Sequence, residues 1–284
     1  MPPSGVSAYK PVIAESPETV IPQWRAFLSD TADSEQTMPA VAFFAGKTKK
    51  PRLEFWALRV DLADPRVKIV ISPGGERADG VPGVFSSEKV SSFTRRRGLA
   101  AGINALPFDK VSAKEGEDRR NAGIVISGGV LLSPPRPVYD ALVFYPDGKA
   151  AIVSQARITT SEGIEHAAGG FRRILDSGAV SERTAGLTAR HPRSAAGVSE
   201  DGELLYLLVI DGRRPGSVGS TEAETAAILK QLGAWDGINF DGGGSSVLAL
   251  RYPGGAVAPV NKPVHGGIPG RERAVAGSLG VEIR

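Results

Sequence analysis

Two aspartates, each at the end of an apolar run, are the side chains in this sequence best suited to chemistry. Asp211 follows the run 204–210 (LLYLLVI), and Asp241 follows the run 237–240 (GINF). A pair of carboxylates can supply a nucleophile, a general base or a general acid, as in the hydrolysis of glycosidic bonds. Aspartate before glycine is also typical of an ordinary turn, so a purely structural role for both residues is the alternative.

Three consecutive glycines and two serines follow Asp241 in the run 241–246 (DGGGSS). One glycine suffices for a turn, and three leave a stretch of backbone without side chains. The exposed N–H groups of such a turn can form a nest for an anion, and Ser245 adds a hydroxyl donor. No lysine follows the glycines, so the run is not a P-loop. The alternative is a β-bulge or a tight hairpin.

Four other polar residues are candidates for contacts with a ligand. Arg193 carries a planar guanidinium that suits a phosphate, although a lone arginine also commonly forms a surface ion pair. Asn104 is the one polar residue of an apolar run, and it is either a satisfied buried amide or a ligand contact. Glu272 and Arg273 are adjacent, so on a strand only one of them faces the site.

The elements that must position these residues are mostly short strands. We predict an α+β (mixed α/β) fold with a central mixed β-sheet, helices packed on it and an N-terminal half rich in β-hairpins. Hairpins are expected at 123–132, 141–153 and 194–210, and a short helix is expected at 90–97. Residues 1–30 are predicted to form an N-terminal arm, and residues 31–284 a single catalytic domain.

The C-terminal third predicts a βαβ unit that joins the two aspartates. A helix is expected from Thr221 to Leu232, because Thr221 and Glu224 match a capping box and Gly233 can end the helix. The strands before and after it would be parallel and would share a carboxyl edge. If the strands are neighbours, Asp211 and Asp241 lie roughly 5–10 Å apart.

Composition excludes several classes of protein. The chain has 284 residues, no cysteine and three histidines, which excludes a disulfide scaffold, a zinc finger, an iron–sulfur site and a cysteine nucleophile. Lysine and arginine number 34 against 31 aspartate and glutamate, and the short basic clusters lack interleaved aromatics, so we expect no nucleic-acid partner. No apolar run is long enough to span a membrane.

Short motifs in the C-terminal third, with two looser ones upstream, resemble those of the phosphodiester glycosidase family. The matching motifs are Pro192-Arg193-Ser194-Ala195-Ala196-Gly197, Asp211-Gly212-Arg213, Gly219-Ser220-Thr221, Leu232-Gly233-Ala234, Asn239-Phe240-Asp241-Gly242-Gly243-Gly244-Ser245-Ser246, Asn261-Lys262-Pro263 and Glu272-Arg273-Ala274-Val275-Ala276, with looser matches at 104–108 and 123–129. Three positions depart from the family pattern: His191 replaces an asparagine, Ala105-Leu106 a glycine pair, and Val247 a threonine or serine. The first two departures affect the expected shape of the substrate pocket.

The resemblance implies a hydrolase that cleaves the glycosidic bond of a sugar-1-phosphodiester and leaves a phosphomonoester. It implies that Asp241 or Asp211 attacks the anomeric carbon or activates water there. Arg193 and the backbone of Gly242, Gly243 and Gly244 would hold the phosphate, and Arg273 would add a second positive charge. The other implied substrate-binding residues are Asn104, Asn239, Ser245, Thr221 and Glu272.

Two other functions stay open from the sequence. One is a non-catalytic module that binds an anionic glycan of an envelope or exopolysaccharide. The other is a metal-dependent phosphodiesterase that uses Asp211, Asp241 and Asn239 as oxygen ligands, so a divalent cation such as calcium or magnesium is not excluded. We expect an extracytoplasmic protein, periplasmic or secreted, whose leader is absent from this sequence, with the cytoplasm as the alternative. The sequence does not predict an oligomeric state.

Overall fold

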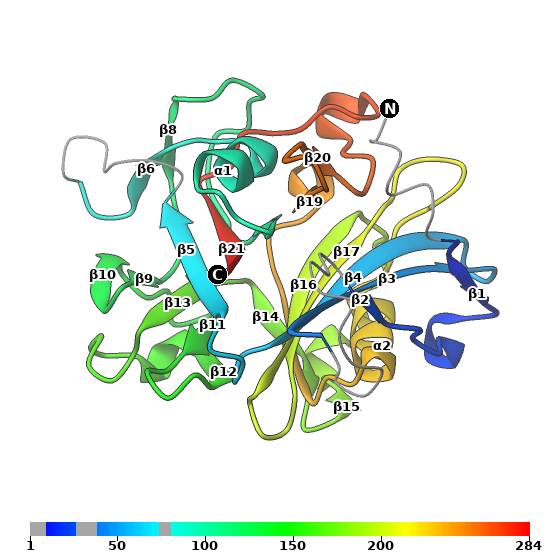
Figure 1. The fold of residues 1–284 in the computed structure, drawn as a ribbon, viewed down its shortest axis with the longest axis horizontal. Helices are drawn as coiled ribbons and strands as arrows, with labels where there is room; N and C mark the ends of the chain where they lie inside the picture. The colour runs from blue at the N-terminus through cyan, green and yellow to red at the C-terminus, as the bar shows by residue number, and fades with distance from the viewer. Residues whose placement is uncertain (1–9, 27–38, 74–80) are drawn as a thin grey trace.

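The computed structural model describes residues 10–26, 39–73 and 81–284. Strands account for 43% of the residues and helices for 13%, so the molecule is sheet-rich and the predicted α+β class describes it only loosely. Figure 1 shows the strands gathered in several sheets, with α2 (Glu222–Leu232) and α1 (Val90–Arg96) on different parts of the molecule. Neither helix in this part of the chain is long and apolar enough to cross a membrane.

The largest sheet has nine strands and is mixed, as predicted. Its spatial order is β1 (Val12–Ala14), β3 (Val41–Thr48), β4 (Leu53–Asp61), β17 (Leu204–Ile210), β16 (Arg193–Val198), β18 (Asp236–Asn239), β14 (Arg172–Asp176) and β15 (Ala179–Val180), and β2 (Arg25–Ala26) pairs with β3. Only β1 and β3 pair in parallel. The described part of the predicted N-terminal arm therefore joins this sheet at its edge, and the rest of residues 1–30 lies outside the described residues.

Two five-stranded sheets and one two-stranded sheet complete the fold. The first five-stranded sheet contains β10 (Val130–Ser133), β9 (Val125–Ser127), β13 (His166–Gly169), β11 (Asp140–Phe144) and β12 (Ala150–Ser154), and the second contains β20 (Val257–Pro259), β19 (Leu248–Arg251), β7 (Ala101–Asn104), β21 (Gly277–Ile283) and β5 (Val67–Pro73). The pair is β6 (Val84–Ser86) with β8 (Asp118–Arg120). Short 3₁₀ turns are η1 (Pro17–Thr19), η2 (Gln155–Arg157), η3 (Glu182–Thr184), η4 (Gly243–Ser245) and η5 (His265–Gly267). The three predicted hairpins and helix α1 are confirmed.

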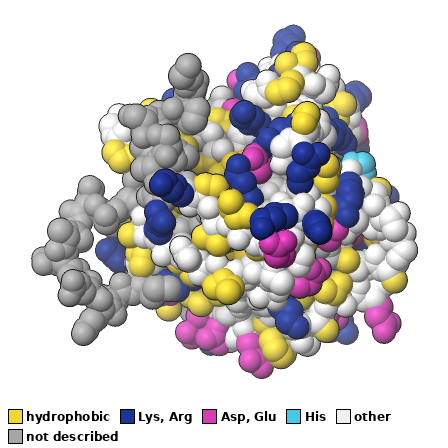
Figure 2. All heavy atoms as spheres, turned by 90° about the vertical axis from the view of Figure 1, so that its right-hand side faces the viewer, with side chains coloured by type: hydrophobic (Ala, Val, Ile, Leu, Met, Phe, Trp, Pro, Cys, Tyr) yellow, Lys and Arg dark blue, Asp and Glu magenta, His cyan; other side chains and the backbone are white. Residues whose placement is uncertain are grey.

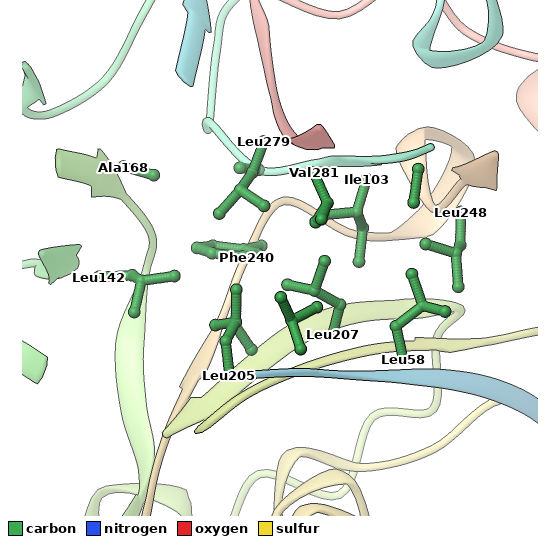
Figure 3. Close-up of a cluster of buried hydrophobic side chains, with 14 of the residues drawn as sticks. Leu58, Ile103, Leu142, Ala168, Leu205, Leu207, Phe240, Leu248, Leu279 and Val281 are labelled. Carbon is green, nitrogen blue, oxygen red and sulfur yellow. The ribbon is translucent and has the colours of Figure 1, made fainter. Parts of the chain in front are cut away.

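Strand β17 is apolar along its whole length because it is covered on both faces. Leu205, Leu207 and Val209 point into the main core, whereas Leu208 and Ile210 join a second core beneath α2. Figure 3 shows the main core, in which side chains of the nine-stranded sheet meet those of the five-stranded sheets. Burial on both faces thus explains the continuous apolar run.

Helix α2 forms as its sequence predicts. Thr221 Oγ1 accepts from Glu224 N at 3.1 Å, and Glu224 Oε2 accepts from Thr221 N at 3.0 Å, which completes the capping box. Gly233 ends the helix with φ of 110°, a left-handed conformation that favours glycine. The helix packs on the nine-stranded sheet and fixes the loop that precedes it, which carries several candidate site residues.

Candidate active site

The carboxyl ends of β17 and β18 lie at the same edge of the nine-stranded sheet. Both strands pair antiparallel with β16, so they run in the same direction. Arg193 at the start of β16 is opposite Ile210, the last residue of β17. The predicted parallel direction and shared edge are confirmed, but the strands are not neighbours, because β16 lies between them and separates them by two strand spacings, or about 10 Å.

Asp211 is buried, with 1% of the residue exposed, and both of its carboxylate oxygens are bonded. Oδ2 accepts from Arg214 Nε at 2.9 Å and from Arg214 Nη2 at 2.5 Å. Oδ1 accepts from Asn261 Nδ2 at 3.1 Å and from the backbone N–H of Lys262 at 3.1 Å. Burial raises the pKa of Asp211, and the charge of Arg214 opposes this. The carboxylate of Asp211 therefore links the loop after β17 to the segment 261–262.

Asp241 has a fixed backbone and a less saturated carboxylate. Its N–H donates to the carbonyl of Ala105 at 3.0 Å, and its carbonyl accepts from Asn104 Nδ2 at 2.7 Å. The preceding residue, Phe240, is fully buried and lies in the middle of the main core in Figure 3. These contacts hold the backbone of Asp241 in place.

The electrostatic surroundings of the Asp241 carboxyl group suit acid–base work. Burial raises its pKa to about 6, against hydrogen bonds from the Ser245 side chain and the Gly242 backbone and the positive charge of Arg273. A carboxyl group with a pKa near 6 is mostly ionised at neutral pH yet basic enough to take a proton. A pKa near 6 is therefore compatible with a role for Asp241 as a general base.

The glycines after Asp241 bring two guanidinium groups onto bare backbone. Gly243 has φ of 62°, and its N–H donates to the carbonyl of Pro192 at 2.8 Å. A Cβ on Gly244 would lie 2.5 Å from Arg273 Nη2, and one on Gly243 would lie 3.0 Å from Arg213 Nη2. A side chain at either position would make the neighbouring guanidinium shift, so the glycine run permits the close approach of both arginines as well as the turn.

Arg273 lies beside the turn and is held by two hydrogen bonds. Its Nη1 donates to Ser245 Oγ at 3.1 Å, and its Nε donates to His265 Nδ1 at 3.1 Å. Burial lowers the pKa of Arg273, and Asp241 opposes this shift. Within the described residues Arg273 has no salt bridge to a carboxylate, so its charge is available for an anionic ligand.

Arg213 is a site residue that the sequence reasoning did not select. It adopts φ of 58°, a strained conformation for a residue with a side chain, and such strain is typical of functional positions. Its Nη2 lies 3.4 Å from His191 Nδ1, and the residue is exposed. Across the parts of the chain that are described, Arg213 forms no salt bridge either. Its place in the Asp-Gly-Arg motif, directly after a strand end, was the available signal.

Arg193 has a different environment from the one its predicted phosphate contact requires. The residue is 8% exposed, and its guanidinium donates to the carbonyls of Ser220 at 3.2 Å and Ala189 at 3.1 Å. Nη1 also lies 3.4 Å from Glu222 Oε1 on the first turn of α2. Its donors therefore hold the loop before α2, and its backbone neighbour Pro192 receives the bond from the glycine turn.

The two asparagines differ in how far their polar atoms are used. Asn104 Oδ1 accepts from Ser194 Oγ at 2.6 Å and from Val247 N at 3.1 Å, in addition to the bond from its Nδ2 to Asp241. Asn239 is 2% exposed, and its Oδ1 has no hydrogen-bond partner. Asn104 thus fixes the backbone of Asp241. The buried Oδ1 of Asn239, by contrast, accepts no hydrogen bond from the described residues.

Two predicted substrate-binding residues instead bond to the first turns of helices. Thr221 is the N-cap of α2, as described above. Glu272 Oε2 accepts from the backbone N–H of Ser91 at 3.2 Å, in the first turn of α1. Burial raises the pKa of Glu272. Glu272 therefore reaches α1, while its neighbour Arg273 reaches the glycine turn.

Basic side chains surround the turn. The guanidinium groups of Arg213 and Arg273 lie against its backbone, and Figure 2 shows many Lys and Arg side chains, with Asp and Glu side chains among them, on the right-hand face of Figure 1. Burial lowers the pKa of both His191 and His265, and nearby arginines lower it further. An anion, more than a cation, is the ligand that this charge distribution favours.

A divalent cation has few free ligands here. In the residues that the structure describes, no three His, Cys, Asp or Glu side chains gather to hold a metal. Of the oxygen ligands proposed from sequence, Asp211 is already bonded to Arg214, Asn261 and Lys262. A cation would have to displace those contacts to use it.

A cavity of about 310 Å³ lies elsewhere, lined by residues that include Val67, Ile69, Phe144 and His166. None of its lining residues belongs to the strand ends or to the glycine turn.

Comparison with known proteins finds a relative with a similar sequence. SPbeta prophage-derived uncharacterized protein YomE of Bacillus subtilis (strain 168) is 30% identical over 187 residues, which is 59% of this chain and 27% of that protein. The chain thus spans about a quarter of the length of this curated relative.

Two solved structures share the fold. The catalytic domain of zebrafish N-acetylglucosamine-1-phosphodiester alpha-N-acetylglucosaminidase, auto-inhibited by its pro-peptide, has a TM-score of 0.65 and 21% identity, covering 94% of this chain and 89% of that one. A candidate exported protein of Burkholderia pseudomallei K96243 has a TM-score of 0.56 and 18% identity, covering 81% of this chain and 74% of that one.

The match to the phosphodiester glycosidase family covers residues 97–282. That range is more than half of the chain and includes both aspartates, the glycine turn, Arg213 and Arg273. The resemblance inferred from the motifs is confirmed: this protein belongs to the phosphodiester glycosidase family.

Proposed function

We propose that this protein hydrolyses sugar-1-phosphodiesters at the bond between the anomeric carbon and the phosphate oxygen. Water adds to the anomeric carbon, the carbon–oxygen bond to phosphate breaks, and the products are a free sugar and a phosphomonoester. The observation that carries this proposal is the position of the Asp241 carboxylate beside a glycine turn on which the guanidinium groups of Arg213 and Arg273 lie.

The charges of the site fit this reaction. The departing phosphate gains a second negative charge as the bond breaks, so stabilising that charge matters more than protonating the leaving group. Arg213, Arg273 and the backbone of Gly242–Gly244 supply positive charge and N–H dipoles at one place. Asp241 then attacks the anomeric carbon or activates the water that does so, and the anomeric form of the released sugar distinguishes the two courses.

The remaining candidates support these groups. Asn104 fixes the backbone of Asp241, and the Ser245 side chain bonds the Asp241 carboxyl group. Arg193 fixes the Pro192 segment that receives the bond from Gly243, and Asp211 fixes the loop that carries Arg213. An extracytoplasmic location is supported by the description of the Burkholderia pseudomallei structure as that of a candidate exported protein.

The test is hydrolysis of a panel of sugar-1-phosphodiesters in ¹⁸O-labelled water, with and without a chelator, followed by mass spectrometry. We expect ¹⁸O in the free sugar, none in the phosphate, and no loss of rate with chelator. Label in the phosphate, together with loss of rate on chelation, would instead support the metal-dependent phosphodiesterase. Saturable binding without products would support the glycan-binding module.

A further inference from the structure

His265 makes a side-chain hydrogen bond that defines its protonation state. Its Nδ1 lies 3.1 Å from Arg273 Nε, and a guanidinium can only donate, so Nδ1 must be the acceptor. An imidazole that accepts at Nδ1 is neutral and carries its proton on Nε2. The contact therefore exists only while His265 is uncharged.

This contact is the first of a series of hydrogen bonds that runs from His265 through Arg273 and Ser245 to the proposed catalytic carboxylate of Asp241. Arg273 Nη1 donates to Ser245 Oγ at 3.1 Å, and the Ser245 side chain bonds the Asp241 carboxyl group. The bond to His265 uses Nε of Arg273, so it fixes the plane of the guanidinium that lies on Gly244. Rotation of that plane would move both the phosphate-binding charge and the Ser245 contact.

We propose that His265 is a positioning residue that holds Arg273 on the glycine turn in its neutral form and releases it when protonated. This inference rests on the proposed function, because Arg273 is there a phosphate-binding group. His265 touches neither the anomeric carbon nor the phosphate, and it acts only through Arg273.

The groups around His265 make its protonation disruptive. Arg273 and Arg271 are the charged groups of its own segment, and both lower its pKa, after burial. From the facing turn η4, Gly244 packs against the His265 backbone, and the charged groups at that turn are Asp241 and Arg213. A proton on His265 would remove the acceptor and add a third positive charge next to two arginines.

The decisive variants replace the ring nitrogens one at a time. In His265→Asn the amide oxygen takes the place of Nδ1 and can still accept from Arg273, whereas in His265→Gln the amide group lies near the position of Nε2. We expect the Asn variant to keep kcat/KM within about threefold of wild type. The Gln and Ala variants should lose about 10–100-fold, the range for a lost hydrogen bond to a charged group.

The pH profile separates positioning from simple packing. In wild type, protonation of Asp241 abolishes activity and protonation of His265 lowers it by about 10–100-fold, so log kcat/KM should fall with a slope above 1 over the roughly one to two pH units in which both groups titrate. In His265→Asn only Asp241 titrates, and the slope should be 1. Equal slopes in the two proteins, or a Gln variant as active as the Asn variant, would overturn the proposal.

A spectroscopic reading of the free protein keeps this test independent of the substrate. ¹⁵N NMR of the His265 ring at neutral pH should show the neutral Nε2–H tautomer, with Nδ1 as an acceptor. An Nδ1–H tautomer or a charged ring would contradict the contact. If the tautomer is as expected but no sugar-1-phosphodiester is cleaved, the proposed function fails while the contact stands.

Discussion

Asp211 and Asp241 follow two strands of one sheet, but their carboxylates have different surroundings. Asp211 is saturated by Arg214, Asn261 and Lys262, and nothing is left of its carboxylate for a ligand. No arginine among the described residues bonds the Asp241 carboxylate directly, and burial raises the pKa of Asp241 to about 6. The same residue type at equivalent strand ends is thus fully paired in one case and, in our proposal, catalytic in the other.

The difference follows from what lies opposite each strand end. The loop after β17 supplies its own arginine three residues on, and the segment 261–262 covers the other carboxylate oxygen. The loop after β18 supplies glycines, so that Arg273 and Arg213 reach the backbone of the turn and keep their charge available. A structural carboxylate is paired, whereas a functional one is placed beside cations that a substrate can share.

The largest effect that tests this contrast is expected from Asp241→Asn. Loss of the carboxylate removes the attacking or proton-accepting group, so kcat should fall by about 10³-fold or more. Free sugar is measured by mass spectrometry, and circular dichroism checks that the fold is retained. Wild-type turnover in a folded Asn variant would remove Asp241 from the mechanism.

A smaller loss is expected from Arg273→Gln, because the charge that stabilises the departing phosphate is removed. We expect kcat/KM to fall about 10²–10³-fold, as for other groups that stabilise developing negative charge. The control is Arg66→Gln, which removes an exposed arginine paired with Asp64. Equal activity of the two variants would show that Arg273 does not bind the phosphate.

Replacing each aspartate by asparagine should change the free energy of unfolding in opposite directions. Burial raises the pKa of Asp211 as well, but its carboxylate is paired with the partly buried Arg214 guanidinium. Asp211→Asn therefore leaves that cation with Glu54 alone among its described carboxylate partners, and it should lower the free energy of unfolding by about 2–3 kcal/mol. Asp241→Asn should instead raise it, by about 1–2 kcal/mol at pH 7. Urea denaturation of both variants measures the difference, with Asp147→Asn as an exposed control.

The sign for Asp241 follows from its raised pKa. Between the pKa of the unfolded chain and about 6, the native state binds the proton more tightly, so stability falls as pH rises through this window. Above it the cost of the buried charge is complete, and the neutral amide avoids that cost. A less stable Asp241→Asn variant at pH 7 would contradict the idea that burial dominates at this site.

Much of the local structure was predictable from sequence because its causes are local. The capping box of Thr221 and Glu224, the left-handed Gly233 and the hairpin turns each depend on a few neighbouring residues. The grouping of Asp241 with the glycines is local as well. These features needed no knowledge of which strands pair over long distances.

The unpredicted parts depend on contacts between distant segments. The place of β16 between β17 and β18 is a choice of pairing that the apolar pattern of each strand does not encode. Burial of the Arg193 guanidinium against Ala189 and Ser220 depends on that same packing. Arg213 was overlooked because its significance lies in its backbone conformation and its contact with Gly243, which residue type alone does not reveal.

The pH dependence of kcat/KM for sugar release tests the central claim, that ionised Asp241 drives the reaction, most directly. A phosphodiester substrate keeps a single negative charge across the range, so the acid limb belongs to the enzyme. We predict activity that rises with pH through about 6 and then reaches a plateau, as the carboxyl group loses its proton. Activity that stays constant from pH 4.5 to 7.5, or that falls as pH rises through about 6, would contradict the account.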